Sequence, residues 1–529
     1  MSSLPNPTAR ISLFVICVQI IGAIIDEGMR SSCSALCSVV QLSAVVYGRT
    51  YRESTALAER QAVKHKSASR PRLGKNHLSK KLSRWNKFFY GAGDIGFSLT
   101  STIVSTYLLI FMTDVVGIPV GLAGIPLLIG RSWDWINDPL VGHISDRTRT
   151  RWGRRRPFLL FGALPFGLAF AMLWYRPPWE GTLPLVAYYA TAYVLYEIAA
   201  TFVYMPYFAL TPELTSDYDE RTSLTTYRMF FSILGSLIAF TVPLLIIGTF
   251  EPQSAPRVTT MGMIFAIASA LPLLLVFFGT RERQAHMALE QPRLLQSLRA
   301  AWQNRPFRYS LGIFLLTWIC MGVIQLVLLY FLKYWLRRED ESDLIMAVIF
   351  VTAIFALPLW QWVAHKWSKR WAYVAGVAFW AVMQILLVTV TSSTAMPIVL
   401  ILCFLAGIGV AAAHVLPWAI IPDAIEWDEW QTGERHEGMF YSLTTLIHKI
   451  ALSLAVLVIP LVLEFTGYQP NVAQQSPGVL WGLRILIGPV PAILLCAGIL
   501  LAIRYPLTRE RYAQILRDLE ARQRNGGDT

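Results

Sequence analysis

Two aspartates in an apolar segment are the first candidates for chemistry in this sequence. Asp134 and Asp138 are four residues apart, so both carboxylates lie on one face if the segment is helical. Arg131, one turn earlier, balances only one of the two acids, which leaves a surplus negative charge. A buried surplus of this kind suits Na⁺ or H⁺. The alternative is an ion-pair cluster that only holds helices together.

Lys449 is the natural counter-ion for these acids. It lies in a long apolar segment with no acidic residue within one helical turn. Such a lysine either pairs with a fixed acid or exchanges with a bound cation. Further ionisable residues in apolar blocks are Asp94, Glu197, Arg228, His414, His448 and Arg484.

Signatures of an enzyme are missing from the sequence. It contains no HExxH, no GxSxG and no Walker loop, which argues against a polytopic membrane enzyme. The histidines at 365, 414, 436 and 448 lie on separate segments without the spacing of metal ligands. We therefore expect no enzyme activity and no cofactor, and no bound metal other than a coupling Na⁺.

The elements that position these residues are long apolar blocks. The chain of 529 residues is 55% hydrophobic and 15% charged, whereas soluble domains average about 45–50% and about 25%. A bilayer core of about 30 Å needs about 20 apolar residues as helix. The blocks are longer than the strands of a membrane β-barrel, and their apolar and polar residues do not alternate as in such strands. The sequence therefore predicts an all-α membrane protein with twelve transmembrane helices, at 88–113, 119–144, 157–175, 184–209, 226–250, 259–280, 309–336, 342–364, 371–391, 396–421, 437–465 and 479–506.

The basic residues indicate how these helices cross the membrane. The loop 145–157 carries six arginines, and the connections 281–308 and 366–370 are also basic, whereas the opposite loops carry few cations. Because basic loops stay on the cytoplasmic side, we expect a multi-pass protein of the inner or plasma membrane. Both ends of its twelve-helix core would lie in the cytoplasm. The net charge of +13 then reflects membrane topology, and no nucleic-acid partner is expected.

The same pattern divides the chain into predicted regions. An N-terminal extension, 1–86, holds the short apolar segment 11–25 and a basic linker. An apolar segment of this length fits a signal-like segment or a buried helix as well as a membrane contact. The remaining regions are a six-helix bundle at 87–280, a cytoplasmic connection at 281–308, a second six-helix bundle at 309–506 and a cytoplasmic tail at 507–529.

The two predicted bundles are weakly repeated. MPYFALTPELTSDYDE (205–220) matches LPWAIIPDAIEWDE (416–429) in its prolines, aromatic residues and acids, and Pro139 matches Pro358. Many transporters built from repeated halves hold their ligands near the membrane midplane between the halves. In this register Asp138 corresponds to Leu357, so the acid is confined to the first half. That asymmetry favours a functional role for the acid.

Several motifs together resemble the glycoside–pentoside–hexuronide:cation symporters, the melibiose-permease-like branch of the major facilitator superfamily. They are YGAGDIGF (90–97), RSWDWINDPLVG (131–142), RTRTRWGRRRPF (147–158), PYFALTPELTSDYDERTSLTTYR (206–228) and PDAIEWDEWQTGERHEGMFYS (422–442). The resemblance spans about 85–507. It implies the superfamily's fold and cation-coupled symport of a sugar or glycoside by alternating access.

The resemblance also assigns roles to residues. It implies a cation site at Asp134 and Asp138, with Lys449 as the helix-eleven lysine. Tyr204 stands where the family has a third aspartate, and its hydroxyl is a weaker third ligand. With one acid fewer, we expect H⁺ in preference to Na⁺. Residues expected to have structural or gating roles are Arg131, Gly142, Asp146 and Arg147.

The substrate site departs from the family pattern. Ser98 replaces the family's sugar-binding acid, and Phe208 and His414 replace two tryptophans. The expected ligand is a small-molecule solute, a sugar or glycoside, with a lysolipid carrier and a non-transporting membrane sensor as alternatives. The sequence carries no indication of an oligomeric state. Expected substrate contacts are Asp94, Tyr204, Phe208, Arg228, His414 and Trp418.

Overall fold

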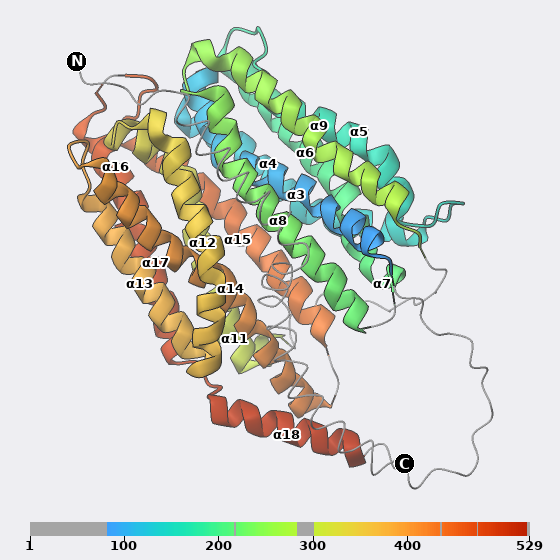
Figure 1. Cartoon of the computed structure of the whole chain (residues 1–529). Coiled ribbons are helices and arrows are strands. Elements are labelled where there is room, and N and C mark those ends of the chain that lie inside the picture. Colours follow the sequence, from blue (N-terminus) through green and yellow to red (C-terminus); the bar gives the residue numbers. More distant parts are fainter. Residues whose placement is uncertain (1–81, 216–217, 283–300, 434–435, 473, 526–529) are drawn as a thin grey trace, which may run out of the picture. The chain divides into compact units, whose positions relative to one another are not determined.

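The computed structural model describes residues 82–215, 218–282, 301–433, 436–472 and 474–525 (Figure 1). The predicted apolar segment 11–25, nearly all of the N-terminal extension and most of the connection 281–308 lie outside these residues. All of the described helices belong to the unit that begins at Lys81.

Helices of the first half follow one another with short connections. They are α3 (Arg84–Ile110) with its π-helical end η1 (Phe111–Val116), α4 (Val120–Arg147), α5 (Arg156–Leu173), α6 (Thr182–Ala209), the short α7 (Thr211–Leu214), α8 (Tyr218–Ile247), the short η2 (Pro252–Ser254) and α9 (Ala255–Gly279).

The second half repeats this order. It consists of α11 (Arg305–Tyr330) with its π-helical end η3 (Phe331–Trp335), η4 (Glu339–Glu341), α12 (Ser342–Lys366), α13 (Lys369–Thr389), α14 (Met396–Thr432), α15 (Glu437–Phe465), α16 (Pro477–Ile487) and α17 (Pro489–Ile503). The helix α18 (Arg509–Asn525) follows, in the predicted tail.

The prediction of an all-α membrane protein is confirmed. Eleven helical stretches of the described chain are long and apolar enough to cross a membrane. The remaining predicted span is α4, whose 28 residues reach about 42 Å at 1.5 Å per residue. Arg131, Asp134 and Asp138 make α4 more polar than the other spans. The residues with candidate chemistry are thus the ones that distinguish this helix.

Some helix bounds differ from those predicted. The helix α14 continues from the predicted end at 421 to Thr432, through Pro417 and Pro422. The last predicted span, 479–506, is two helices, because the chain breaks at Gly488 before Pro489. Proline cannot donate the backbone hydrogen bond that a continuous helix would need there.

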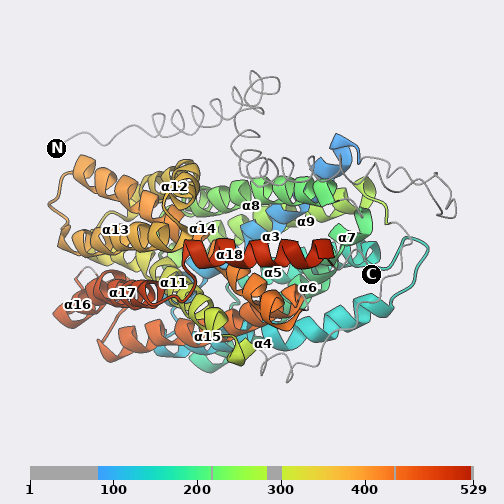
Figure 2. The same cartoon turned by 90° about the horizontal axis from the view of Figure 1, so that it is seen from below.

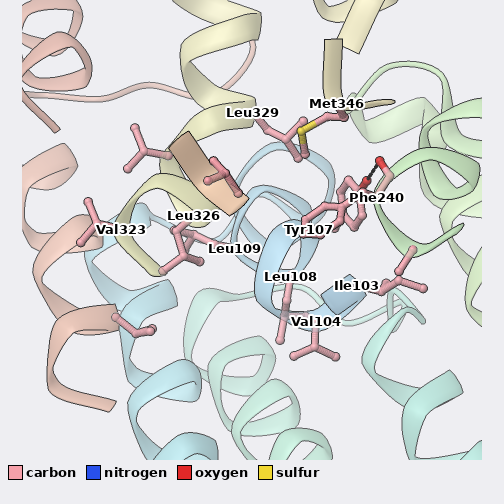
Figure 3. Close-up of a cluster of buried hydrophobic side chains, with 14 of the residues drawn as sticks. Ile103, Val104, Tyr107, Leu108, Leu109, Phe240, Val323, Leu326, Leu329 and Met346 are labelled. Atoms are coloured by element: carbon pink, nitrogen blue, oxygen red, sulfur yellow. Dashed lines mark hydrogen bonds between the residues drawn. The ribbon is translucent and has the colours of Figure 1, made fainter. Parts of the chain in front are cut away.

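Helices from the two halves share one buried core. In the first half α3 packs against α8 and α9, and contacts between the halves join α4 to α15, α8 to α12 and α3 to α11. A side chain at Gly91 would come within 2.9 Å of the Tyr227 backbone, so glycine lets α3 and α8 approach closely. The Tyr107 hydroxyl donates to the Phe240 carbonyl oxygen at 2.8 Å. Figure 3 shows this bond among buried apolar residues of both halves.

The helix α18 lies at the end of the bundle where α14 ends (Figures 1 and 2). Trp430 Nε1 donates to Asp518 at 3.1 Å, and Arg522 donates to the Trp430 carbonyl oxygen at 2.7 Å. Ile515 and Leu519 are buried, so the helix attaches by an apolar face as well as by these bonds. We call this end of the bundle, which also carries the loop 147–156, the basic end.

Candidate functional site

An ion-pair group joins the two halves. Lys449 Nζ on α15 lies 2.9 Å from Asp134 Oδ1 and 2.6 Å from Asp138 Oδ2, both on α4. The three side chains are 18–26% exposed, so the group is mostly shielded from solvent. The structure thus brings together the three residues that the sequence singled out, and it places the lysine between the two acids.

Glu197 on α6 is a third carboxylate near this group. It is buried and interacts electrostatically with Asp134, Arg131 and Lys449. The hydroxyl of Thr201, one turn further along α6, lies beside the Asp138 carboxylate. The position of Glu197 in an apolar block is a signal in the sequence, but no spacing rule connects α6 to α4.

Arg131 occupies a separate position in this group. Its guanidinium donates to Ser105 Oγ on α3 at 2.6 Å and interacts with Glu197 and Asp134. The arginine therefore belongs to the first half, whereas Lys449 comes from the second. Among the described residues, no group of three or more His, Cys, Asp or Glu is arranged to hold a metal ion.

Tyr204 does not join the ion-pair group. Its ring packs against Phe97, with centroids 4.8 Å apart, and against Phe208. Its buried hydroxyl lacks a hydrogen-bond partner within the described part of the chain. Its hydroxyl lies beside Gly96 of α3, so in this arrangement it is not at the ion-pair group, and the role of Tyr204 as a third cation ligand stays a prediction.

Asp94 and Arg228 form a second polar position in the first half. Arg228 Nε on α8 lies 4.0 Å from Asp94 Oδ2 on α3, and the guanidinium lies over the Phe208 ring at 5.1 Å. Asp94 Oδ1 and Arg228 Nε are both buried without a hydrogen-bond partner in the described structure. An acceptor and a donor that lack partners are available to a ligand with hydroxyl or charged groups.

The second half contributes an aromatic group around His414. The imidazole Nδ1 of His414 lies 3.1 Å from the Val410 carbonyl oxygen, and its ring is 5.6 Å from that of Trp318. Trp418 and His448 also contact Trp318 edge to face, with centroids 6.4 Å and 5.4 Å away. Sequence reasoning assigns no role to Trp318 or His448.

Two atoms of this aromatic group are unpartnered. Trp318 Nε1 and His448 Nε2 are buried and have no hydrogen-bond partner among the described residues. His448 directly precedes Lys449 in the chain, so the aromatic group adjoins the ion-pair group.

The remaining predicted residues lie near the basic end of α4. A Cβ atom added at Gly142 would lie 3.9 Å from the Met205 methyl group. Arg147 is exposed at the end of the helix. Asp146 is in α4, but its side chain lies outside the part of the chain that the structure describes. Arg155, which follows in the loop, donates to Ser145 Oγ at 2.6 Å and pairs with Glu213 at 3.1 Å.

The opposite end of the bundle is closed by polar contacts between the halves. Asp114 on η1 is fully buried and bonds Lys333 Nζ on η3 at 2.8 Å and the Tyr468 hydroxyl at 2.5 Å. Tyr334 donates to the same carboxylate, and Asn471 Nδ2 donates to the Asp114 carbonyl oxygen at 2.6 Å. Asp114 lies just past the predicted end of its span, so no pattern in the sequence indicates that it is buried.

Comparison with known proteins places most of the chain in one family. The family model for MFS/sugar transport proteins matches residues 89–509. An uncharacterised symporter of Synechocystis, sll1374, is 31% identical over 84% of this chain and 98% of its own. The sodium-dependent lysophosphatidylcholine symporter 1-A of Danio rerio is 29% identical over 84% of this chain and 90% of its own. A crystal structure of a D-xylose–proton symporter has a TM-score of 0.56 and 16% identity, and covers 80% of this chain and 97% of its own.

Proposed function

This chain belongs to the MFS/sugar transport protein family, and we propose that it is a cation-coupled symporter that works by alternating access. The observation that carries the proposal is the bond from Lys449 of the second half to Asp134 and Asp138 of the first half. A salt bridge that joins the halves can respond to a bound cation and change how the halves meet. Within the family we propose the melibiose-permease-like branch, because the motif 131–142 and the arginine-rich loop after it match that branch.

The first step is exchange of the lysine for a cation. A cation that enters between Asp134 and Asp138 competes with the Lys449 ammonium for the same two carboxylates. Once the cation has taken the place of the ammonium between the two acids, the lysine is released from α4 and the ion pair between α4 and α15 is lost. Burial of an unpaired ammonium is unfavourable, so the halves move apart or the solute supplies a new partner.

The second step couples the solute to this exchange. Four buried atoms have no hydrogen-bond partner within the described ranges and are available to a solute: His448 Nε2 and Trp318 Nε1 from the second half, and Asp94 Oδ1 and Arg228 Nε from the first. A solute that contacts both halves holds them together when the lysine no longer does. The carrier then reorients only when both ligands are bound, which is the requirement for symport.

We propose Na⁺ as the coupling ion. The expectation of H⁺ rested on a site with only two carboxylates, because Tyr204 replaces an acid. Glu197 lies close enough to interact electrostatically with Asp134 and Asp138, and the Thr201 hydroxyl lies beside Asp138. We propose that these oxygens complete the site around Na⁺ after the lysine has left. The sodium dependence in the name of the zebrafish relative supports the same choice.

Two solute classes are candidates. A sugar or glycoside fits the aromatic faces of Phe208 and Trp418 and the hydrogen-bonding capacity of Asp94 and Arg228. A lysophospholipid is the second candidate, because the zebrafish relative named for lysophosphatidylcholine matches 84% of this chain. Arg228 lies over an aromatic ring, and its Nε has no hydrogen-bond partner in the part of the chain that the structure describes, which suits a phosphate oxygen as well as a sugar hydroxyl.

Uptake into liposomes tests the proposal. The purified full chain is reconstituted, and uptake of radiolabelled lysophosphatidylcholine and of a panel of glucosides and galactosides is measured at fixed pH, with and without inward Na⁺. We expect one class to accumulate several-fold more with Na⁺, even when a protonophore collapses the proton gradient. Stimulation by a proton gradient alone would instead assign H⁺. Ligand binding without uptake in either gradient would favour a membrane sensor and would contradict symport.

A further inference from the structure

An apolar cavity with basic neighbours lies at the turn between α12 and α13. The cavity has a volume of about 300 Å³ and is lined by Trp367, Trp371, Val374 and Ala375. The two indoles that form its rim are 57% and 50% exposed. An apolar cavity between exposed tryptophans, on a helix that crosses the membrane, faces the lipid rather than the protein core.

Basic residues flank the two tryptophans of this cavity in the chain, and Arg509 of α18 contacts the same turn. Lys366 is exposed, and its ammonium lies 5.0 Å from the Trp362 ring. Arg370 lies over the Trp371 ring at 5.2 Å, and Arg509 of α18 donates to the Trp367 carbonyl oxygen at 3.3 Å. In the described structure no carboxylate is within ion-pairing distance of Lys366 or Arg370. The site therefore carries a positive charge that the protein itself does not neutralise.

The position of the site in the membrane indicates what kind of molecule it binds. Tryptophans gather at the level of the lipid headgroups, and basic residues next to them attract anionic lipids. The neighbouring Lys369 is paired with Asp423 at 2.5 Å. Arg370 donates to the carbonyl oxygens of Ile503 and Tyr505, so Lys366 is the cation whose ammonium is open to a headgroup. The apolar lining of the cavity matches an acyl chain, and the positive charge of the adjoining turn matches an anionic headgroup.

We propose that this cavity binds one anionic phospholipid, independently of the transported solute. An acyl chain occupies the space between Trp367 and Trp371, and the headgroup phosphate lies against Lys366, with the Arg370 charge nearby. Since Arg509 holds the first residue of α18 to the end of α12, the bound lipid also lies beside the attachment point of the C-terminal helix. The site is on the outer surface of the second half, away from the Asp134–Lys449 group.

Native mass spectrometry of the detergent-solubilised full chain tests the site. Phosphatidylglycerol and phosphatidylcholine with identical acyl chains are titrated separately, and glycerol phosphate is used as the headgroup without a chain. We expect one tightly bound phosphatidylglycerol, several-fold weaker binding of phosphatidylcholine and no binding of glycerol phosphate. Equal binding of the two lipids would overturn the proposal of an anionic headgroup site.

Matched variants distinguish the cavity from general attraction to a basic surface. Lys366→Gln should weaken phosphatidylglycerol binding about fivefold, the equivalent of about 1 kcal/mol for one cation. Arg517→Gln removes an exposed charge of α18 away from the cavity and should leave binding unchanged. Equal loss in these two variants would show that only the overall charge matters.

A second pair of variants fills space instead of removing charge. Val374→Trp places an indole in the cavity and should abolish tight binding of phosphatidylglycerol. Val382→Trp makes the same change at an exposed position further along α13 and should have no effect. The melting temperature of each variant reports whether it is folded. Tight binding that persists in a folded Val374→Trp protein would rule out the cavity as the site.

Discussion

At the scale of single residues, one ammonium group connects the two halves of the protein. The Lys449 side chain reaches two carboxylates that are one helical turn apart, at 2.9 Å and 2.6 Å. Glu197 adds a third acid from another helix, and Arg131 adds a cation from the same half as the acids. If the two halves separate, Lys449 therefore moves away from the acids with the second half, whereas Arg131 stays with them.

Removing one acid should uncouple transport from the ion. In Asp138→Asn the lysine keeps Asp134, but an entering cation finds one carboxylate fewer, so we expect at least a tenfold loss of accumulation in liposomes. Exchange of solute at equal concentrations on both sides should be less affected. Glu520→Gln, an exposed acid of α18, is the control. Full accumulation of solute by the Asp138→Asn variant would show that Asp138 is not part of the cation site.

Removing the lysine should make the fold depend on the ion. In Lys449→Ala the two aspartates lose their partner, which for buried pairs costs about 3–5 kcal/mol. Because these side chains are partly exposed, we expect the lower end of that range and a fall of several degrees in melting temperature without Na⁺. Added Na⁺ should restore much of the loss. A variant that melts like the wild type, or that Na⁺ does not rescue, would contradict a shared site for ammonium and cation.

At the scale of elements, the first helix of each half ends in a π-helical turn. The turn η1 follows α3 and carries Asp114, and η3 follows α11 and carries Lys333. The equivalent elements of the two repeats thus provide the two partners of the buried ion pair. π-Helical turns occur often at functional sites, and here they position a contact that closes the end of the bundle opposite the basic end.

Breaking this pair should open that end. Loss of one partner of a buried ion pair costs about 3–5 kcal/mol. A free-energy change of roughly 1.4 kcal/mol is enough to shift the ratio of two populations tenfold. Spin labels at Glu180→Cys and Ser392→Cys, in exposed loops of the two halves, report the separation in a background whose other accessible cysteines are serine. In Lys333→Gln we expect a population in which the distance between the labels is several ångströms longer.

A control variant at the same end separates this effect from general loss of charge. Glu341 pairs with Arg338 within one half, with a side chain that is 31% exposed. Glu341→Gln should therefore leave the distance distribution as it is. The same lengthening in both variants, or in neither, would refute the assignment of Asp114 and Lys333 as the contact that holds this end closed.

At the scale of the whole molecule, symport requires that the two ligands affect each other's binding. If solute and Na⁺ both favour the same arrangement of the halves, each raises the affinity of the other by the same factor. We expect the solute identified by uptake to lower the Na⁺ concentration needed for half-maximal thermal stabilisation by about fivefold or more. His414→Ala should weaken solute binding without changing Na⁺ binding alone. Na⁺ affinity that does not depend on solute would contradict the coupling scheme.

The membrane helices, and the polar face of each, follow from the amino-acid sequence alone. Long apolar blocks must be helical in lipid, because each span has to satisfy its own backbone hydrogen bonds. The spacing of Asp134 and Asp138 is enough to put them on one face of α4, and the isolation of Lys449 among apolar residues marks it as their counter-ion. The family motifs then indicate the superfamily and its fold.

Which helices are neighbours depends on the tertiary fold. Periodicity shows which side of a helix is polar but not which other helix that side meets, and for this reason it gives Glu197 no role and does not separate Tyr204 from the cation site. Asp114 and Lys333 are 219 residues apart in the chain, and both lie at span ends where a charge is expected to reach water. Their burial depends on two helix ends of different halves meeting, which no local pattern of residues encodes.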